Sequence, residues 1–158
     1  MRFYTGIGSR ETPPDICEKM SQIAELLRDR GYTLRSGGAK GADRAFEKNL
    51  DARDTNIYLP NSTIPGWCFE EVQKYVPSNR NWNSFNEYTK RLLARDMLQI
   101  YGHKDESISE FVICWTKDGK DSGGTGYALR AAIANNIKIY NLHDEKDTLE
   151  LESFLIGL

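Results

Sequence analysis

The sequence has no apolar run that approaches the roughly 20 residues of a membrane-spanning helix. It has no basic excess either: 21 lysines and arginines are balanced by 23 aspartates and glutamates, so the formal charge is −2. A protein dedicated to nucleic acid usually carries a basic excess or a basic block. The composition therefore argues against a membrane protein, and it does not favour nucleic acid as the partner.

Cysteine and histidine are also scarce. Cys17, Cys68 and Cys114 are far apart and form no CxxC pair, so they predict neither a disulfide framework nor a zinc site, and we interpret them as small core residues. His103 and His143 have no partner at metal-ligand or catalytic spacing, which indicates surface or capping residues. We therefore expect no metal and no cofactor and, with no signal-peptide pattern, a cytoplasmic location.

What the sequence does contain is a regular alternation of strand-like and helix-like segments. The expected strands are residues 2–7, 32–36, 56–60, 111–116 and 137–142. The expected helices are residues 14–30, 42–50, 69–75, 84–101, 127–135 and 149–155. This alternation predicts an α/β fold: one Rossmann-like domain over residues 1–158, with a mostly parallel sheet of about five strands and helices on both faces.

Residues 61–82 fit this alternation poorly. The segment contains Pro65, Trp67, Pro77 and Trp82, and only one helical stretch is expected within it. An excursion of this length is often a functional flap. The segment is either a lid over a binding site or a surface loop held in place by its two tryptophans.

Three of the expected strands end in glycine-rich turns, each of which precedes a helix. The first turn is Gly6-Ile7-Gly8-Ser9-Arg10, the second is Ser36-Gly37-Gly38-Ala39-Lys40-Gly41, and the third is Ser122-Gly123-Gly124-Thr125-Gly126. Parallel strands place such turns at one edge of the sheet, where glycine lets the backbone approach a ligand and helix N-termini attract phosphate. None is a Walker A motif. The turns predict a glycine-lined crevice for a phosphate-bearing nucleotide or nucleotide derivative.

The same motifs resemble the SLOG superfamily, which includes the DNA-processing protein A, YspA/YpsA-related and Lonely Guy families. The resemblance rests on the first two glycine turns, on Ala94-Arg95-Asp96, on residues 111–116 and on the third turn, and it covers nearly the whole chain. Small stand-alone members of this kind are common among bacteriophage proteins. The resemblance implies a homo-oligomer that binds nucleotides, a nucleotide-derived signal such as an ADP-ribose derivative or, in the DNA-processing branch, single-stranded DNA.

The Lonely Guy branch implies an enzymatic alternative, because its members cleave the N-glycosidic bond of nucleoside monophosphates with an arginine and a glutamate. Arg95 matches the arginine, whereas residues 127–130, where the glutamate is expected, contain no carboxylate. Asp43 and Glu47 are candidate substitutes, four residues apart behind the second turn. Alternatively, Asp43 is a first-turn partner of the helix dipole and Glu47 is a solvated side chain. Asp43, Glu47 and Arg95 are thus the candidate catalytic residues.

The helix expected at 84–101 carries further candidates. Its apolar residues suggest one buried face, made of Phe85, Tyr88, Leu92 and Ile100. Polar residues recur at intervals of four on another face, namely Arg91, Arg95 and Gln99. Arginine is suited to phosphate through its planar fork, although a solvated helix face is the alternative. A local basic cluster is expected near the crevice from Arg10, Arg35, Lys40, Arg44, Arg91 and Arg95.

The candidate ligand-binding residues combine the glycine turns with side chains near the same sheet edge. Trp115 is expected either to stack on a base or to belong to the core. The set is Gly6, Gly8, Ser9, Arg10, Ser36, Gly37, Gly38, Ala39, Lys40, Gly41, Arg91, Arg95, Trp115, Thr116, Gly123, Gly124, Thr125 and Gly126. The favoured interpretation is a sensor or sequestering protein for a nucleotide-derived small molecule. A nucleotide N-glycosidase and a single-stranded DNA-binding protein are the alternatives.

Overall fold

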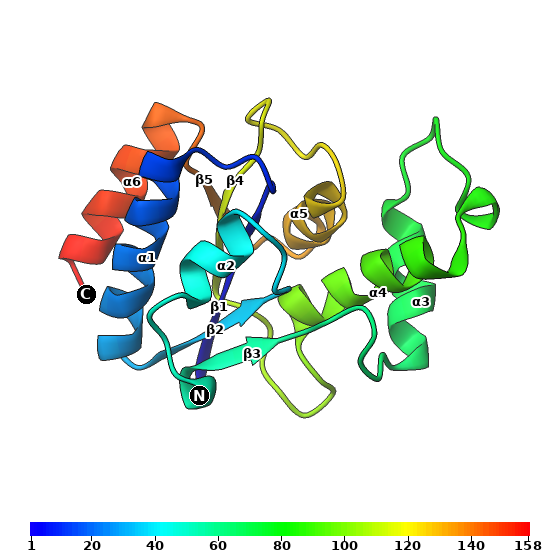
Figure 1. The fold of residues 1–158 in the computed structure, drawn as a ribbon, viewed down its shortest axis with the longest axis horizontal. Helices are drawn as coiled ribbons and strands as arrows, with labels where there is room; N and C mark the ends of the chain where they lie inside the picture. The colour runs from blue at the N-terminus through cyan, green and yellow to red at the C-terminus, as the bar shows by residue number, and fades with distance from the viewer.

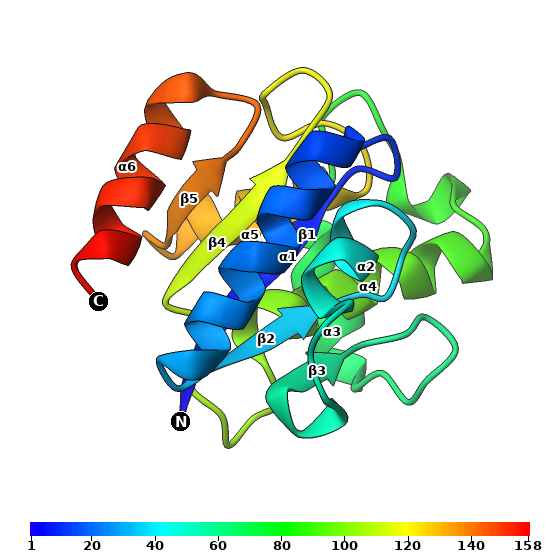
Figure 2. The same cartoon turned by 60° about the vertical axis from the view of Figure 1, so that its left-hand side comes forward.

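The computed structural model describes all of residues 1–158 and has a five-stranded parallel sheet as its central layer (Figures 1 and 2). The strand order is β3-β2-β1-β4-β5. The strands are β1 (Arg2–Gly8), β2 (Tyr32–Ser36), β3 (Thr55–Ile57), β4 (Phe111–Trp115) and β5 (Lys138–Asn141). The α/β fold class, the number of strands and their parallel arrangement are confirmed. The chain adds β2 and β3 on one side of β1 and then β4 and β5 on the other side. Ligands of Rossmann-like sheets bind where the direction of this strand order changes, which is between β1 and β4 here.

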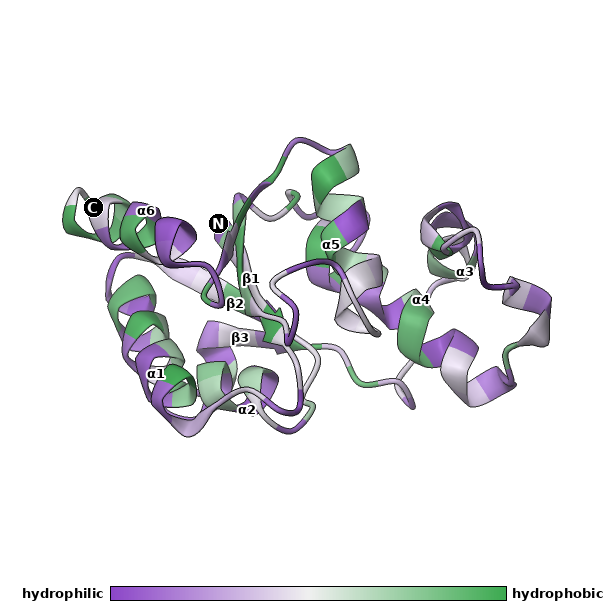
Figure 3. Ribbon diagram, turned by 90° about the horizontal axis from the view of Figure 1, so that it is seen from above, coloured by the Kyte–Doolittle hydropathy of each residue, from purple (hydrophilic) through white to green (hydrophobic).

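Helices cover both faces of the sheet, as seen from above in Figure 3. One layer consists of α1 (Pro14–Asp29), α2 (Ala42–Glu47) and α6 (Glu145–Ile156). The other consists of α3 (Gly66–Val72), α4 (Glu87–Tyr101) and α5 (Thr125–Ala134). Short 3-10 turns occur at Ala52–Asp54, Gln73–Tyr75 and Trp82–Ser84. No helix combines the length and the apolar character that a membrane span requires.

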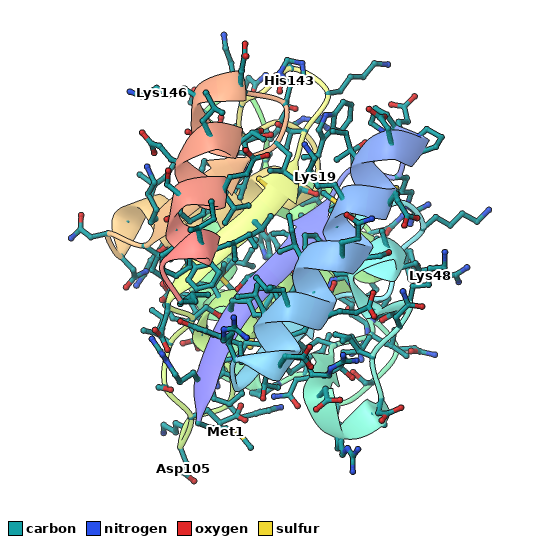
Figure 4. All side chains as sticks on the ribbon, turned by 90° about the vertical axis from the view of Figure 1, so that its left-hand side faces the viewer. Met1, Lys19, Lys48, Asp105, His143 and Lys146 are labelled. Atoms are coloured by element: carbon teal, nitrogen blue, oxygen red, sulfur yellow. The ribbon has the colours of Figure 1, made fainter.

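Two hydrophobic clusters fill the space between the sheet and the two helical layers. In β4 the side chains alternate between them: Val112 and Cys114 join the cluster under α4 and α5, whereas Phe111 and Ile113 join the one under α1 and α6. A central strand buried on both faces reads as a continuous apolar run, which is why β4 was recognisable in the sequence. Lys48 and Lys146 point outward on opposite sides of the layer formed by α1, α2 and α6 (Figure 4).

Helix capping explains where α4 begins. The helix was expected from Ser84, but it begins at Glu87 because the Asn86 side chain accepts a hydrogen bond from the Thr89 amide at 2.8 Å. Ser84 instead ends a 3-10 turn, at whose start the Asn81 side chain accepts from the Asn83 amide. Gly102, with φ 70°, ends α4 as expected.

The burial expected for α4 is partly wrong. Tyr88 is 58% exposed, whereas Arg95 and Gln99 are 8% and 3% exposed. The reason is that the second half of α4, from Leu93 to Ile100, lies between the sheet and two helices, α3 and α5, and is buried on every side. A single apolar stripe describes a helix on a surface, and this half of α4 is internal.

Candidate functional site

A cleft of about 920 Å³ opens at the carboxyl edge of β1 and β4. Its walls come from the first and third glycine turns, from one face of α4, from the start of α5 and from residues 77–85. The loop before α5 and the loop between α3 and α4 both rise at this edge of the sheet (Figure 1). The volume lies within the range of small-molecule sites, roughly 300 to 1,000 Å³.

The first glycine turn is held in place by Asp43. One carboxylate oxygen of Asp43 accepts from the Gly8 amide at 3.2 Å and the other accepts from the Ala39 amide at 3.3 Å. Both oxygens are therefore engaged with backbone, and Asp43 joins the first turn to the second. Gly41 completes this junction: its φ is 81°, and a Cβ there would lie 2.5 Å from the Ser9 carbonyl oxygen.

The second glycine turn packs behind the first instead of lining the cleft. The Ser36 hydroxyl donates to the Gly6 carbonyl at 2.6 Å, and the Gly37 carbonyl accepts from Arg95 at 2.7 Å. A Cβ at Gly38 would meet the Leu59 side chain at 2.8 Å. Ala39 is the member of this turn that reaches the cleft wall.

The third glycine turn leaves amide groups unpaired at the start of α5. Gly124 is the N-cap and offers no side chain to cap the helix. The amides of Gly126 and Tyr127 bond within the turn, whereas those of Gly124 and Thr125 have no backbone acceptor. A Cβ on Gly123 or Gly124 would meet no atom within 4 Å, so this turn is open. Such a helix start attracts anions.

Basic side chains surround the mouth of the cleft. Lys117 pairs with Glu11 at 3.4 Å on the surface, and Arg130 pairs with Asp121 at 3.3 Å. Arg10 and Arg80 also line the cleft, are exposed and form no ion pair. These two guanidinium groups are free to contact a negatively charged ligand.

The floor of the cleft contains two buried carboxylates close to Arg95, namely Asp43 and Asp96. The Arg95 guanidinium donates to the Gly37 and Tyr58 carbonyls, at 2.7 and 2.9 Å, and to Asp96 at 3.1 Å. Burial raises the pKa of Asp96 to about 7, since desolvation outweighs the opposing charge of Arg95. Burial likewise raises the pKa of Asp43 to about 6, again against Arg95. Carboxyl groups that titrate near neutrality are typical of functional sites.

Ten of the predicted site residues line this one cleft. They are Gly8, Ser9, Arg10, Ala39, Asp43, Arg95, Thr116, Gly123, Gly124 and Thr125. The others lie outside it, namely Gly6, Ser36, Gly37, Gly38, Lys40, Gly41, Glu47, Arg91, Trp115 and Gly126. The first and third turns therefore meet at the cleft, and the second turn supports them from behind.

Several side chains outside the cleft have clear structural roles. Arg91 donates to the carbonyls of Pro60 and Ser62, which ties the segment after β3 to α4. Trp115 packs beside the α1 and α6 cluster and lies 5.8 Å from the His143 ring. The expected basic cluster does not form as a whole, since only Arg10 and Arg95 of its members line the cleft. Arg35 is fully buried, and its guanidinium lies 3.8 Å from the centre of the Phe3 ring.

Residues 61–82 contribute directly to the cleft. Pro77, Asn79 and Arg80 line it. The tryptophans act as anchors: Trp67 packs edge-on against Tyr101 at 5.9 Å, and Trp82 packs against Phe85 at 6.1 Å. The segment is therefore held in place by its tryptophans and forms one wall of the cleft.

Several cleft residues were not among the predicted site residues. They are Arg80, Phe85, Leu92, Asp96, Gln99, Lys117 and Tyr127. A signal existed for two of them: Asp96 directly follows Arg95, and Gln99 lies one turn further along the same helix. The apolar ones carried no signal, because they read as ordinary core positions.

A scan against models of known protein families finds no match, and neither does a search of curated proteins. Among solved structures, DNA processing protein A from Helicobacter pylori is similar, with a TM-score of 0.55 and 18% sequence identity. The match covers 98% of this chain and 73% of that chain, whose structure concerns its single-stranded DNA binding mode. At this identity the similarity establishes a shared fold, which agrees with the Rossmann-like fold expected from the sequence.

Proposed function

We propose that this protein binds a phosphate-bearing nucleotide or nucleotide derivative in the cleft, as a sensor or sequestering protein. One observation carries the proposal: a single cleft of about 920 Å³ combines an anion-attracting end with an aromatic and aliphatic wall. A nucleotide has the same two-sided chemistry, with phosphate at one end and a flat apolar base at the other. The cleft volume is large enough for a dinucleotide-sized ligand.

The phosphate end is formed by the third glycine turn together with Arg10 and Lys117. The amides of Gly124 and Thr125 have no backbone acceptor and lie at the positive end of the α5 dipole, and both residues line the cleft. Arg10 adds an unpaired guanidinium that suits bidentate contacts to phosphate. We assign the phosphate to this end because amides and cations converge there.

The base end is formed by Phe85, Leu92 and Tyr127, with the 77–80 segment above them. Phe85 and Leu92 are partly exposed to the cleft, so their apolar surface is available to a base. Burying a flat ring against such side chains is favourable in proportion to the apolar area removed from water. Arg80 reaches the same wall from the segment above.

The proposal is tested by thermal shift and calorimetry with AMP, ADP-ribose, NAD and cyclic ADP-ribose isomers, since a ligand that binds the native state raises its melting temperature. Gly124→Val places a side chain in the open turn and should abolish binding without unfolding the protein. Gly66→Val is the matched control, because Gly66 also begins a helix, also has free space at its Cβ, and lies outside the cleft. Equal affinity in both variants would refute the proposed site.

The same experiment separates binding from turnover. Chromatography of the nucleotide after incubation should return it intact if the protein is a sensor or sequestering agent. Release of free base would instead identify an N-glycosidase. Asp43 is then a poor candidate for the catalytic carboxylate, since both of its oxygens accept backbone hydrogen bonds. We also propose self-association, as the resemblance implies, which light scattering measures directly.

Single-stranded DNA is the second candidate, favoured by the fold shared with DNA processing protein A. Arg10, Arg80 and Lys117 offer phosphate contacts around the cleft mouth. The acidic Glu11 and Asp121 lie at the same mouth, which weakens the field for a polyanion. Fluorescence anisotropy with a labelled oligonucleotide at several salt concentrations tests it, because phosphate contacts make affinity fall steeply with salt.

A further inference from the structure

Two polar side chains on the cleft floor have hydrogen-bonding capacity that the protein does not use. They are Asp96 and Gln99, three residues apart on α4 and therefore on one face of the helix. Both line the cleft, although they are only 5% and 3% exposed. Buried polar groups are normally hydrogen-bonded, so each needs an explanation.

The side chains of Asp96 and Gln99 form a single hydrogen bond between them to the rest of the protein. One oxygen of Asp96 accepts from Arg95 at 3.1 Å, and the second oxygen has no partner. Gln99 uses its backbone carbonyl, which accepts from the Thr5 hydroxyl, while its side-chain amide has no partner. Neither residue belongs to the side chains whose unpaired atoms are sealed from solvent, which are Tyr4, Tyr32, Arg35 and Tyr58. The free atoms of Asp96 and Gln99 are therefore reached from the cleft.

The position of this pair follows from the course of α4. Thr89, Leu92 and Leu93 line the cleft nearer the start of the helix, and Asp96 and Gln99 follow on the same side, toward the sheet. From Thr89 to Gln99 the helix rises about 15 Å, which is comparable to the length of a nucleotide. Asp96 is also close enough to Asp43, which holds the first glycine turn, for the two charges to interact. The pair thus lies between the apolar wall and the first glycine turn, which carries Arg10 of the phosphate end.

We propose that Asp96 and Gln99 bind the ribose hydroxyls of the ligand and make the cleft selective for ribonucleotides over deoxyribonucleotides. The proposal rests on the function proposed above, because it assigns the sugar to the stretch between base and phosphate. A carboxylate oxygen accepts from a hydroxyl, and an amide both accepts and donates. Two adjacent hydroxyls match these groups better than a single donor does.

Burial supports this assignment. A hydroxyl that donates to Asp96 favours the charged carboxylate, whose pKa burial has raised to about 7. A bound deoxyribose would cover the cleft floor and leave the free oxygen of the Asp96 carboxylate without a partner. Such a buried, unpaired oxygen carries the full desolvation penalty of the group. DNA has no 2′-hydroxyl, so this floor disfavours it as the preferred ligand.

The test compares AMP and ADP-ribose with their 2′-deoxy analogues by calorimetry on the full chain. We expect the ribonucleotide to bind about ten- to a hundredfold more tightly in the wild type. Asp96→Asn and Gln99→Leu should each weaken the binding of the ribonucleotide and leave the affinity for the deoxy analogue nearly unchanged. The ratio of the two affinities should therefore fall toward one. Glu87→Gln is the matched control, an exposed carboxylate on the same helix outside the cleft.

The possible outcomes separate the two proposals. Equal affinity for the ribo and deoxy forms in the wild type overturns ribose recognition and leaves nucleotide binding intact. A ribose preference that survives in Asp96→Asn and Gln99→Leu also overturns it. IMP has the ribose of AMP and lacks its exocyclic amine, so it tests whether Asp96 and Gln99 contact the base instead of the sugar. If these two substitutions change the affinity for AMP and leave the affinity for IMP unchanged, the assignment to the ribose is refuted. No binding by any nucleotide removes both proposals.

Discussion

Replacing Asp96 with asparagine should stabilise the protein at alkaline pH. Asp96 is a buried carboxylate whose pKa is about 7 in the folded protein, against a reference value of 3.8. Between these two values the folded state binds more protons than the unfolded chain, so the free energy of unfolding falls as the pH rises. Above pH 7 the cost of the buried charge is fully present, and below about pH 4 it is absent.

The magnitude follows from the two pKa values. A difference of about 3 pH units corresponds to about 4 kcal/mol at pH 8, which is the upper limit of the gain. Part of it is lost, because asparagine is a weaker acceptor for the Arg95 guanidinium, which still keeps the Gly37 and Tyr58 carbonyls. We expect Asp96→Asn to raise the free energy of unfolding at pH 8 by about 1–3 kcal/mol, or the melting temperature by roughly 3–10 °C.

Urea unfolding at pH 8 and pH 5, followed by circular dichroism, measures this effect. As the pH falls, the free energy of unfolding of the wild type should approach that of the variant. Most of the difference between the two free energies should disappear by pH 5. Glu87→Gln on the same helix, an exposed carboxylate, should show no such change. A variant less stable than the wild type at pH 8 would refute the reasoning, since the ion pair with Arg95 would then outweigh the cost of burial.

Three further predictions concern the glycine turns and the 61–82 segment. Asp43→Ala should lower the free energy of unfolding by about 2–3 kcal/mol in urea, because it strips acceptors from the Gly8 and Ala39 amides; an unchanged value would contradict its bracing role. Gly41→Ala should cost more than about 2 kcal/mol, since φ is 81° and the Cβ meets backbone; differential scanning calorimetry would show a clearly lower melting temperature. Arg80→Ala should weaken nucleotide binding about tenfold in calorimetry. Its melting temperature should not change, because Arg80 is exposed and forms no ion pair; undiminished affinity would show that the 61–82 segment does not contribute to binding.

Much of the fold was predictable because its signals are local. Residues 32–36 form β2 as expected, and β4 matches to within one residue, since a glycine turn or polar loop follows each strand. Capping displaced the start of α4, because Asn81 and Asn86 each accept a backbone amide and divide the segment. Burial of its second half depended on contacts with three neighbours, which no periodicity within one helix encodes.

The site was predictable to the extent that it depends on strand ends. The first and third glycine turns follow β1 and β4, which are neighbours, and both line the cleft. The second turn follows β2, one strand away from the point where the order reverses, so it packs behind the first. The sequence indicated three equivalent turns because strand order is a property of the whole chain and is not encoded in any one motif.

The cost of keeping Asp96 buried is itself an argument about function. At neutral pH the buried carboxylate destabilises the folded protein by more than its single bond to Arg95 stabilises it, although an asparagine would accept that bond more weakly. Functional sites commonly keep such groups at the expense of stability. If Asp96→Asn is both more stable and less able to tell ribose from deoxyribose, the two measurements together explain why the carboxylate is there. If it is more stable and binds ribonucleotides unchanged, the stability argument stands while the reason for Asp96 must be sought elsewhere in the cleft.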